Sequence, residues 1–61
     1  MNTYTFYWLD GTREVLKGKS VADAFRDAGY GARAIAALDF TRNGEDNSYE
    51  WDGKKWNKKS E

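Results

Sequence analysis

Apolar and aromatic residues dominate the first part of the chain, and polar residues then begin to alternate with them. Residues 3–9 are all β-branched, aromatic or leucine, a composition typical of a half-buried strand. The Asp10-Gly11 pair that follows tolerates the positive φ angles of a tight turn, and residues 12–17 alternate polar and apolar side chains. The pattern predicts a β-hairpin over residues 3–17.

The length of the hairpin loop decides which side chains share a face, because a shift of one residue moves every side chain to the other face. A two-residue loop pairs Phe6 with Val15. It gathers three apolar residues on the opposite face: Tyr7, Leu9 and Leu16. A three-residue loop with a bulge would instead put Leu16 with Phe6, and Val15 with Tyr7. We prefer the two-residue loop.

An amphipathic helix is predicted after residue 20. Ser20 can accept a hydrogen bond from the backbone N–H of Asp23, as a helix N-cap does. Four apolar residues then fall at helical spacing: Val21, Ala24, Phe25 and Ala28. Gly29 can adopt the left-handed conformation that ends a helix. We therefore expect one short helix between Ser20 and Gly29.

The segment from residue 31 to residue 40 carries two competing patterns. Residues 32–37 are rich in alanine, which favours a helix, whereas the residues from 36 onward alternate apolar and polar side chains as in a strand. We expect a helical turn that gives way to a strand near Leu38.

The last part of the chain predicts a second hairpin. Residues 43–47 are polar and contain glycine, after which Tyr49 and Trp51 alternate with polar residues. Asp52-Gly53 repeats the turn chemistry of the first hairpin, and a two-residue loop would pair Tyr49 with Trp56. Residues 57–61 are expected to fray.

Together these elements predict an α+β fold: a small antiparallel sheet of β-β-α-β-β order, with room for a short fifth strand and with one helix packed on one face. We expect the 61 residues to form one small globular domain. The helix residue Phe25 is expected to pack over five side chains of the sheet: Phe6, Trp8, Leu38, Phe40 and Trp51. The opposite face of the sheet is expected to stay open.

Composition narrows the classes of function. Ten lysines and arginines balance ten acidic residues, so no overall field steers the chain toward nucleic acid or a membrane. The chain lacks histidine and cysteine, which excludes catalysis by Cys–His or Ser–His pairs. It also lacks a run of about 18 apolar residues. We expect a soluble, cytoplasmic, non-enzymatic protein with no cofactor and no membrane association, of a size compatible with a bacterial or phage-encoded small protein.

One segment has the spacing of calcium ligands. Oxygen-bearing residues fall at positions one, three, five, nine and twelve of the stretch that begins at Asp39, and Gly44 stands at the sixth position, as in an EF-hand loop. However, Asp46 occupies the eighth position, which is normally apolar, and no helix begins after Trp51. We interpret the segment as a polar loop between two strands and predict no metal site.

Lysines surround a tryptophan near the carboxyl end, which could neutralise phosphates while the indole stacks on a base. This nucleic-acid hypothesis includes two basic residues of the first hairpin, and its full set is Arg13, Lys17, Lys54, Lys55, Trp56, Lys58 and Lys59. The balanced net charge argues against it, and we keep it as the alternative.

The favoured hypothesis is a small non-catalytic interaction domain that binds a protein partner or forms a homodimer. Its predicted surface is the open sheet face with Tyr7, Leu9 and Leu16, or an edge strand.

Overall fold

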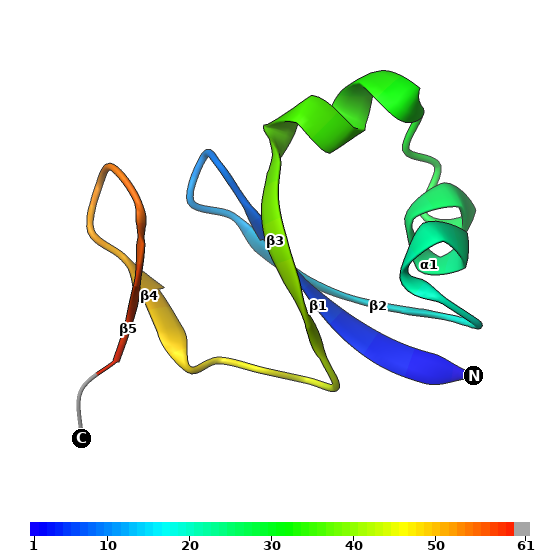
Figure 1. Ribbon diagram of the computed structural model, residues 1–61, viewed down its shortest axis with the longest axis horizontal. Helices are drawn as coiled ribbons and strands as arrows, with labels where there is room; N and C mark the ends of the chain where they lie inside the picture. Colours follow the sequence, from blue (N-terminus) through cyan, green and yellow to red (C-terminus); the bar gives the residue numbers. More distant parts are fainter. Residues whose placement is uncertain (60–61) are drawn as a thin grey trace.

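The computed structural model describes residues 1–59 and has three layers (Figure 1). Its elements in chain order are β1 (Asn2–Trp8), β2 (Arg13–Gly18), α1 (Val21–Asp27), the 3-10 helix η1 (Ala32–Ala37), β3 (Leu38–Asn43), β4 (Tyr49–Trp51) and β5 (Trp56–Lys58). The molecule is thin, with extents of 32 × 24 × 11 Å. The predicted α+β class is confirmed, and the fifth strand is present.

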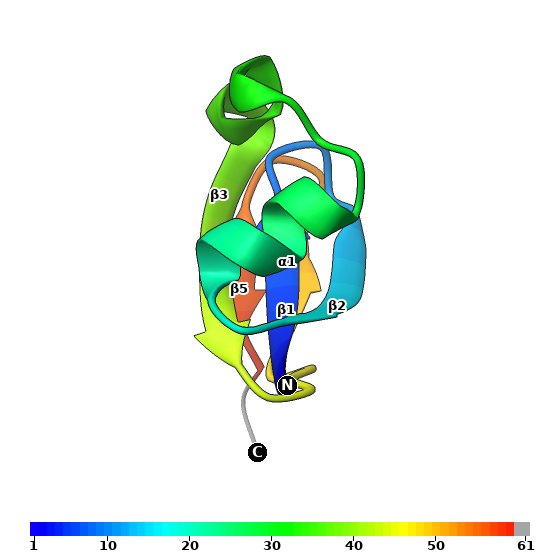
Figure 2. The same cartoon turned by 90° about the vertical axis from the view of Figure 1, so that its right-hand side faces the viewer.

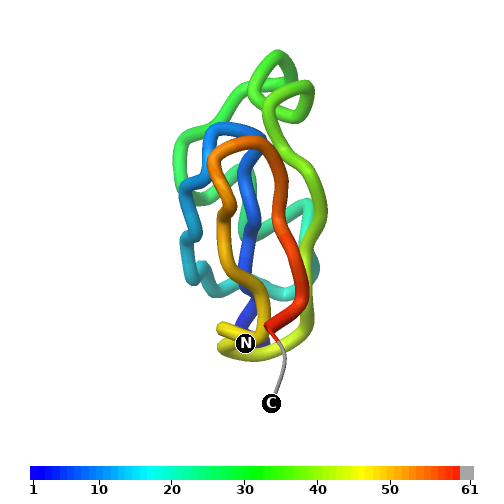
Figure 3. The backbone as a smooth tube through the Cα atoms, turned by 90° about the vertical axis from the view of Figure 1, so that its left-hand side faces the viewer, coloured from blue at the N-terminus to red at the C-terminus, as the bar shows by residue number. Residues whose placement is uncertain are grey.

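The strands form two antiparallel sheets. One has three strands in the order β2-β1-β3, and the other is the β4–β5 hairpin. Helix α1 covers one face of the larger sheet (Figure 2), and the hairpin covers the other (Figure 3). The prediction of a single sheet with an open face is therefore wrong. The face is covered because its aromatic residues, Tyr7 and Phe40, pack against Tyr49 and Trp56 of the hairpin.

The first hairpin has a three-residue loop, so the preferred two-residue register is wrong and the alternative is correct. Phe6 lies opposite Glu14, and Trp8 donates its backbone N–H to the Thr12 carbonyl at 2.8 Å. Gly11, with φ of 92°, completes the loop. Leu16 consequently joins Phe6 on the helix side of the sheet.

The second hairpin also has a longer loop than predicted. Trp51 pairs with Trp56, so Tyr49 lies opposite Lys58 rather than Trp56. The Asp52 carboxylate accepts hydrogen bonds from the backbone N–H groups of residues 54 and 55, each at 2.8 Å. These bonds stabilise a four-residue loop, residues 52–55, in place of the predicted two-residue turn.

The helix boundaries agree with the sequence. Ser20 accepts a hydrogen bond from the Asp23 N–H at 3.2 Å, and Gly29 has φ of 91° after the last turn. Residues 32–37 are helical and β3 begins at Leu38, as predicted.

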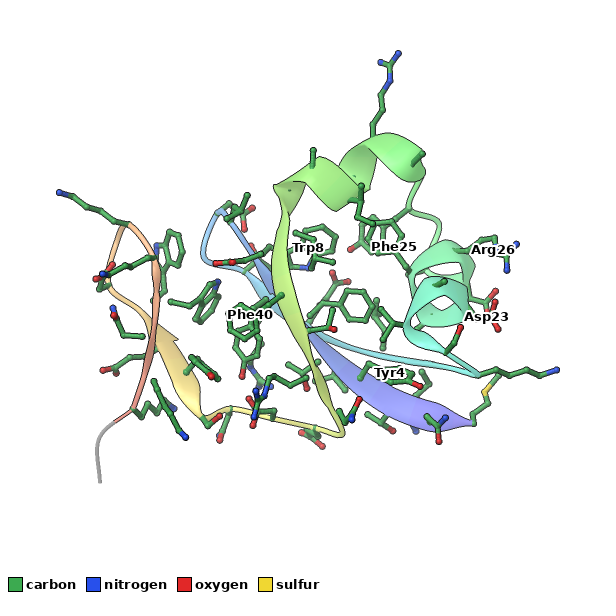
Figure 4. All side chains as sticks on the ribbon, in the orientation of Figure 1. Tyr4, Trp8, Asp23, Phe25, Arg26 and Phe40 are labelled. Atoms are coloured by element: carbon green, nitrogen blue, oxygen red, sulfur yellow. The ribbon has the colours of Figure 1, made fainter. Side chains whose placement is uncertain are left out.

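The core on the helix side consists of the buried residues Phe6, Trp8 and Ala24. Phe25 stacks on Phe6 and Trp8 with ring centroids 6.0 and 5.9 Å apart, which confirms two of its five predicted neighbours (Figure 4). Leu38 packs against the same cluster. Phe40 and Trp51 do not lie there. Phe40 stacks on Tyr7 on the opposite face of the sheet, and Trp51 belongs to β4 of the separate hairpin.

The carboxyl end is more ordered than predicted. Asn57 and Lys58 belong to β5, and Lys59 donates its backbone N–H to the Ser48 carbonyl at 2.8 Å. Residues 60–61 of the predicted frayed end lie outside the described residues. Between residues 1 and 59, no helix is long and apolar enough to cross a membrane.

Candidate functional site

Tyr7, the first residue of the predicted interaction surface, is inside the protein. Its side chain is 0% exposed and its ring stacks on Phe40 with centroids 4.7 Å apart. The hydroxyl donates to the Asp46 carboxylate at 2.5 Å. Burial, together with this carboxylate, raises the pKa of Tyr7 to about 12. Tyr7 therefore cannot contact a partner in this structure, and the predicted placement is wrong.

The other two residues of that surface are separated from Tyr7. Leu16 is half-buried against the core on the helix side, because of the register of the first hairpin. Leu9 is 51% exposed at the tip of that hairpin. Its backbone N–H donates to the Ala37 carbonyl at 2.8 Å, so Leu9 lies beside the end of η1.

The basic residues of the nucleic-acid hypothesis do not surround a free tryptophan. Trp56 donates its indole N–H to the Trp8 carbonyl at 2.7 Å, and its ring meets the edge of Tyr7 at a centroid distance of 4.7 Å. Arg13 donates to the Asp46 carbonyl at 2.7 Å. Five lysines are exposed on β2, on the loop 52–55 and at the end of β5: Lys17, Lys54, Lys55, Lys58 and Lys59.

The segment with calcium-ligand spacing does not form a calcium-binding loop. Asp39, Thr41 and Asn43 all lie along the extended strand β3, whereas an EF-hand wraps these positions around one ion. The Asp46 carboxylate is occupied by Tyr7 and by the Ser48 hydroxyl, which donates at 2.9 Å. Hydrogen bonds from these two groups lower the pKa of Asp46.

The exposed apolar surface lies instead on η1. Five of the six residues from Ala32 to Ala37 are apolar, and none of the six is buried. Ile35 is 62% exposed. A hydrophobic segment normally gains its stability by burying apolar surface, and this one buries little against the rest of the chain.

A groove runs between η1 and α1. It is an open depression of about 430 Å³ and is mainly apolar, with walls formed by Ala22, Phe25, Arg26, Tyr30, Gly31, Ala32 and Ile35. Phe25 and Tyr30 contact each other with ring centroids 5.1 Å apart, which fixes the aromatic wall. Arg26 is held at the helix surface by an ion pair with Asp23 at 2.7 Å.

A second concave site lies on the other side of Tyr30. This open pocket of about 280 Å³ is lined by Trp8, Asp10, Thr12, Glu14, Tyr30, Ala34 and Ala37. Figure 4 shows Trp8 between β3 and α1, beneath η1. The pocket is thus assembled from β1, the first hairpin loop, β2, the connection between α1 and η1, and η1.

Glu14 is fixed in this pocket by two donors. The Trp8 indole N–H donates to Oε1 of Glu14 at 3.1 Å, and the Tyr30 hydroxyl donates to the same oxygen. The hydrogen bond to Glu14 raises the pKa of Tyr30. Asp10, at the rim, has a lowered pKa because the Thr12 side chain and backbone donate to its carboxylate.

No known protein family, curated protein or solved structure gives a significant match to this chain.

No pattern in the sequence marks Ile35, Tyr30 or Glu14 as surface-forming residues. An isoleucine within an alanine-rich segment was the available signal for the groove. The contact between Glu14 and Trp8 follows only from the three-residue loop, which was the register we did not prefer.

Proposed function

We propose that this protein is a small non-catalytic interaction domain that binds a protein partner through η1 and the groove beside it. One observation carries the proposal: five of the six residues of η1 are apolar, and none of them is buried by residues 1–59. Exposed apolar patches of this kind are typical of interaction sites. The proposal moves the interaction surface from Tyr7 and Leu16 to η1 and keeps Leu9, which borders it.

The occupant we propose is a segment of another protein that inserts an apolar side chain between α1 and η1. The groove offers one rigid aromatic wall, Phe25 and Tyr30, and one exposed aliphatic side chain, Ile35. Aromatic and aliphatic anchors in such grooves supply most of the affinity of peptide-binding domains. The cytoplasmic location expected from the sequence also belongs to this proposal.

A selection of randomised, displayed peptides on the immobilised full chain tests the proposal. We expect enrichment of peptides with large apolar residues, and at least about tenfold weaker binding of those peptides to Ile35→Asp. Because Ile35 is largely exposed, this variant should keep its stability to within about 0.5 kcal/mol.

Val15→Asp is the matched control, because Val15 is also an exposed aliphatic residue but lies on β2, away from the groove. Peptides that bind Ile35→Asp as well as the unmodified chain would overturn the proposal, as would a selection without apolar enrichment. Sedimentation over a range of concentrations distinguishes a second copy as occupant, since only that case gives a dimer that Ile35→Asp dissociates.

A further inference from the structure

We infer that Asn43 is a site of spontaneous covalent modification, at which the backbone nitrogen of Gly44 displaces the side-chain amide when the loop before β4 opens. The product carries aspartate or isoaspartate at position 43 in place of asparagine. The inference is independent of the proposed function, because neither residue lines the groove beside η1. It concerns the loop that attaches the second hairpin to the larger sheet.

Asn43 is the one asparagine of the chain that a glycine follows. The other three asparagines precede Thr3, Ser48 and Lys58. Asparagine is a thermolabile residue because the backbone nitrogen of the next residue can attack its side-chain carbonyl carbon. A side chain on that next residue hinders the attack and restricts the backbone, whereas glycine does neither. The sequence therefore makes Asn43 the most reactive of the four asparagines.

The reaction passes through a cyclic imide, with water as its co-reactant. The Gly44 nitrogen gives up its proton to the solvent and forms a bond to Cγ of Asn43, while the bond from Cγ to the side-chain nitrogen breaks and ammonia leaves. Water then adds to one of the two carbonyl carbons of the imide and opens the ring. Addition at the backbone carbonyl leaves isoaspartate, and addition at Cγ leaves aspartate.

The fold leaves one reacting group free and holds the other. Asn43 is exposed at the end of β3, and its side-chain amide makes no hydrogen bond with any of residues 1–59. The Gly44 N–H, in contrast, donates to the Thr3 carbonyl at 2.7 Å. A nitrogen held in this way neither loses its proton readily nor turns toward Cγ of Asn43. The folded chain therefore protects Asn43 until this hydrogen bond breaks.

The hydrogen bonds of the loop control how often the Gly44 nitrogen is released. The loop connects β3 to the second hairpin (Figure 1). The buried Thr5 hydroxyl donates to the Gly44 carbonyl at 2.7 Å and accepts from the Asp46 N–H at 2.8 Å. Loops held by a few such bonds open without unfolding of the whole chain. Because imide formation is slow compared with loop opening, its rate follows the population of the open loop.

The two Asp-Gly pairs of the chain are protected in a different way. The Thr12 side chain and backbone donate to Asp10, and the backbone N–H groups of residues 55 and 54 donate to Asp52, which lowers the pKa of both carboxyl groups. Both therefore stay ionised at neutral pH, and an ionised carboxylate resists attack at its carbon. The uncharged amide of Asn43 has no such protection.

The modification would weaken the attachment of the second hairpin. Isoaspartate adds a carbon atom to the backbone between residues 43 and 44, so Gly44 no longer lies in register with Thr3. Either product also adds a negative charge beside a loop that already contains Glu45 and Asp46. The modified chain should therefore unfold at a lower temperature than the unmodified chain.

Peptide mapping by mass spectrometry measures the reaction at each asparagine after incubation of the full chain at neutral pH, with and without guanidinium chloride. In denaturant we expect Asn43 to react fastest of the four asparagines. In the folded chain we expect a rate at Asn43 at least about tenfold lower, because the loop is mostly closed. Hydrogen exchange of the Gly44 amide should be slowed by a similar factor, since both reactions need the same opening.

Thr5→Val is the variant that releases the loop, because it keeps the shape of the side chain and removes the hydroxyl. We expect modification of Asn43 to become at least about fivefold faster. Thr3→Val is the matched control on the same strand: it keeps the backbone carbonyl that accepts from Gly44, and its lost hydroxyl bonds to none of residues 1–59. Its rate should match that of the unmodified chain.

Three results would overturn the inference. The first is equal reaction of all four asparagines in denaturant, and the second is a rate at Asn43 that is the same with and without denaturant. The third is an unchanged rate at Asn43 in a folded Thr5→Val variant. If that variant does not fold, the comparison of Gly44 amide exchange with the Asn43 rate decides the question in the unmodified chain.

Discussion

The hydroxyl of Tyr7 donates a 2.5 Å hydrogen bond to the carboxylate of Asp46, which lies 39 positions further along the chain. The same loop is held at further points: Thr5 donates its hydroxyl to the Gly44 carbonyl at 2.7 Å and accepts from the Asp46 N–H at 2.8 Å, and Arg13 donates to the Asp46 carbonyl. These hydrogen bonds connect the loop that precedes β4 to the strands β1 and β2. They position the second hairpin over the face of the sheet.

Tyr7→Phe should destabilise the fold by about 1.5–3 kcal/mol, because it removes a hydrogen bond to a charged acceptor. The ring, which fills the space between Phe40, Tyr49 and Trp56, is kept. Urea denaturation measures the change in the free energy of unfolding. Tyr4→Phe is the control on the same strand: its hydroxyl only accepts from the exposed Asn2 side chain at 3.3 Å, so a comparable loss there would contradict the interpretation.

The fold should lose stability in alkali. In the unfolded chain Tyr7 ionises near its ordinary pKa of 10.0, whereas in the folded protein its pKa is raised to about 12. A group with a raised folded pKa stabilises the fold fully below the unfolded value, and this contribution is lost as the pH rises from 10 to 12. Unfolding curves at a series of pH values should show the decline.

Tyrosinate absorbance gives an independent measurement. Tyr7 and Tyr30, whose pKa values are both raised, should ionise above the ordinary tyrosine pKa of 10.0. In Tyr7→Phe the latest part of the titration should disappear. A titration above pH 10.0 that Tyr7→Phe leaves unchanged would show that the Tyr7 hydroxyl is not protected.

The elements that sequence signals specify locally were predicted correctly. Ser20 and Gly29 bound the helix by their own hydrogen-bonding and backbone preferences, and both act within a few residues of their position. The change from helix to strand at Leu38 follows from a local change of period. Such signals do not depend on the rest of the chain.

The registers and the site depend on distant contacts, which explains why they were not predicted. An Asp-Gly pair accommodates loops of different length, and the packing of Leu16 against the core selects the longer one. The alternation around Tyr7 predicts an apolar face but does not reveal that Tyr49 and Trp56 cover it. The pocket lined by Trp8, Glu14 and Tyr30 draws on β1, β2, η1 and the connecting loops, all of which must be in place.

Gly18→Ala should destabilise the protein by about 1–3 kcal/mol through overpacking. A Cβ atom at Gly18 would lie 2.5 Å from the backbone nitrogen of Ala24, so α1 would have to move away from β2. Thermal unfolding detects the change. Gly31→Ala is the matched control, since nothing lies within 4 Å of a Cβ there and its φ of −88° suits alanine. Equal stability of both variants would show that α1 packs less closely than described.

Trp56→Phe tests whether this tryptophan holds the second hairpin against the larger sheet or is available to stack on a nucleic-acid base. The indole N–H donates to the Trp8 carbonyl, which in Trp56→Phe keeps only the Gly11 backbone N–H, at 3.1 Å, as a donor. We expect the lost hydrogen bond to lower the free energy of unfolding by about 0.5–1.5 kcal/mol. Trp51→Phe should cost less, because Trp51 contributes ring contacts with Trp56 and with the backbone near Gly11.

The same variant tests the nucleic-acid hypothesis when mixed DNA and RNA oligonucleotides are titrated at two salt concentrations. Contacts with several phosphates make affinity fall steeply as salt rises, and stacking on a base adds a contribution that depends on the aromatic ring. Because the Trp56 ring already packs against Tyr7, we expect no oligonucleotide affinity that Trp56→Phe reduces. The opposite result would be salt-sensitive binding that Trp56→Phe weakens although the variant remains folded. Such binding would require the hairpin to release the Trp56 ring, and it would favour nucleic acid over a protein as the partner.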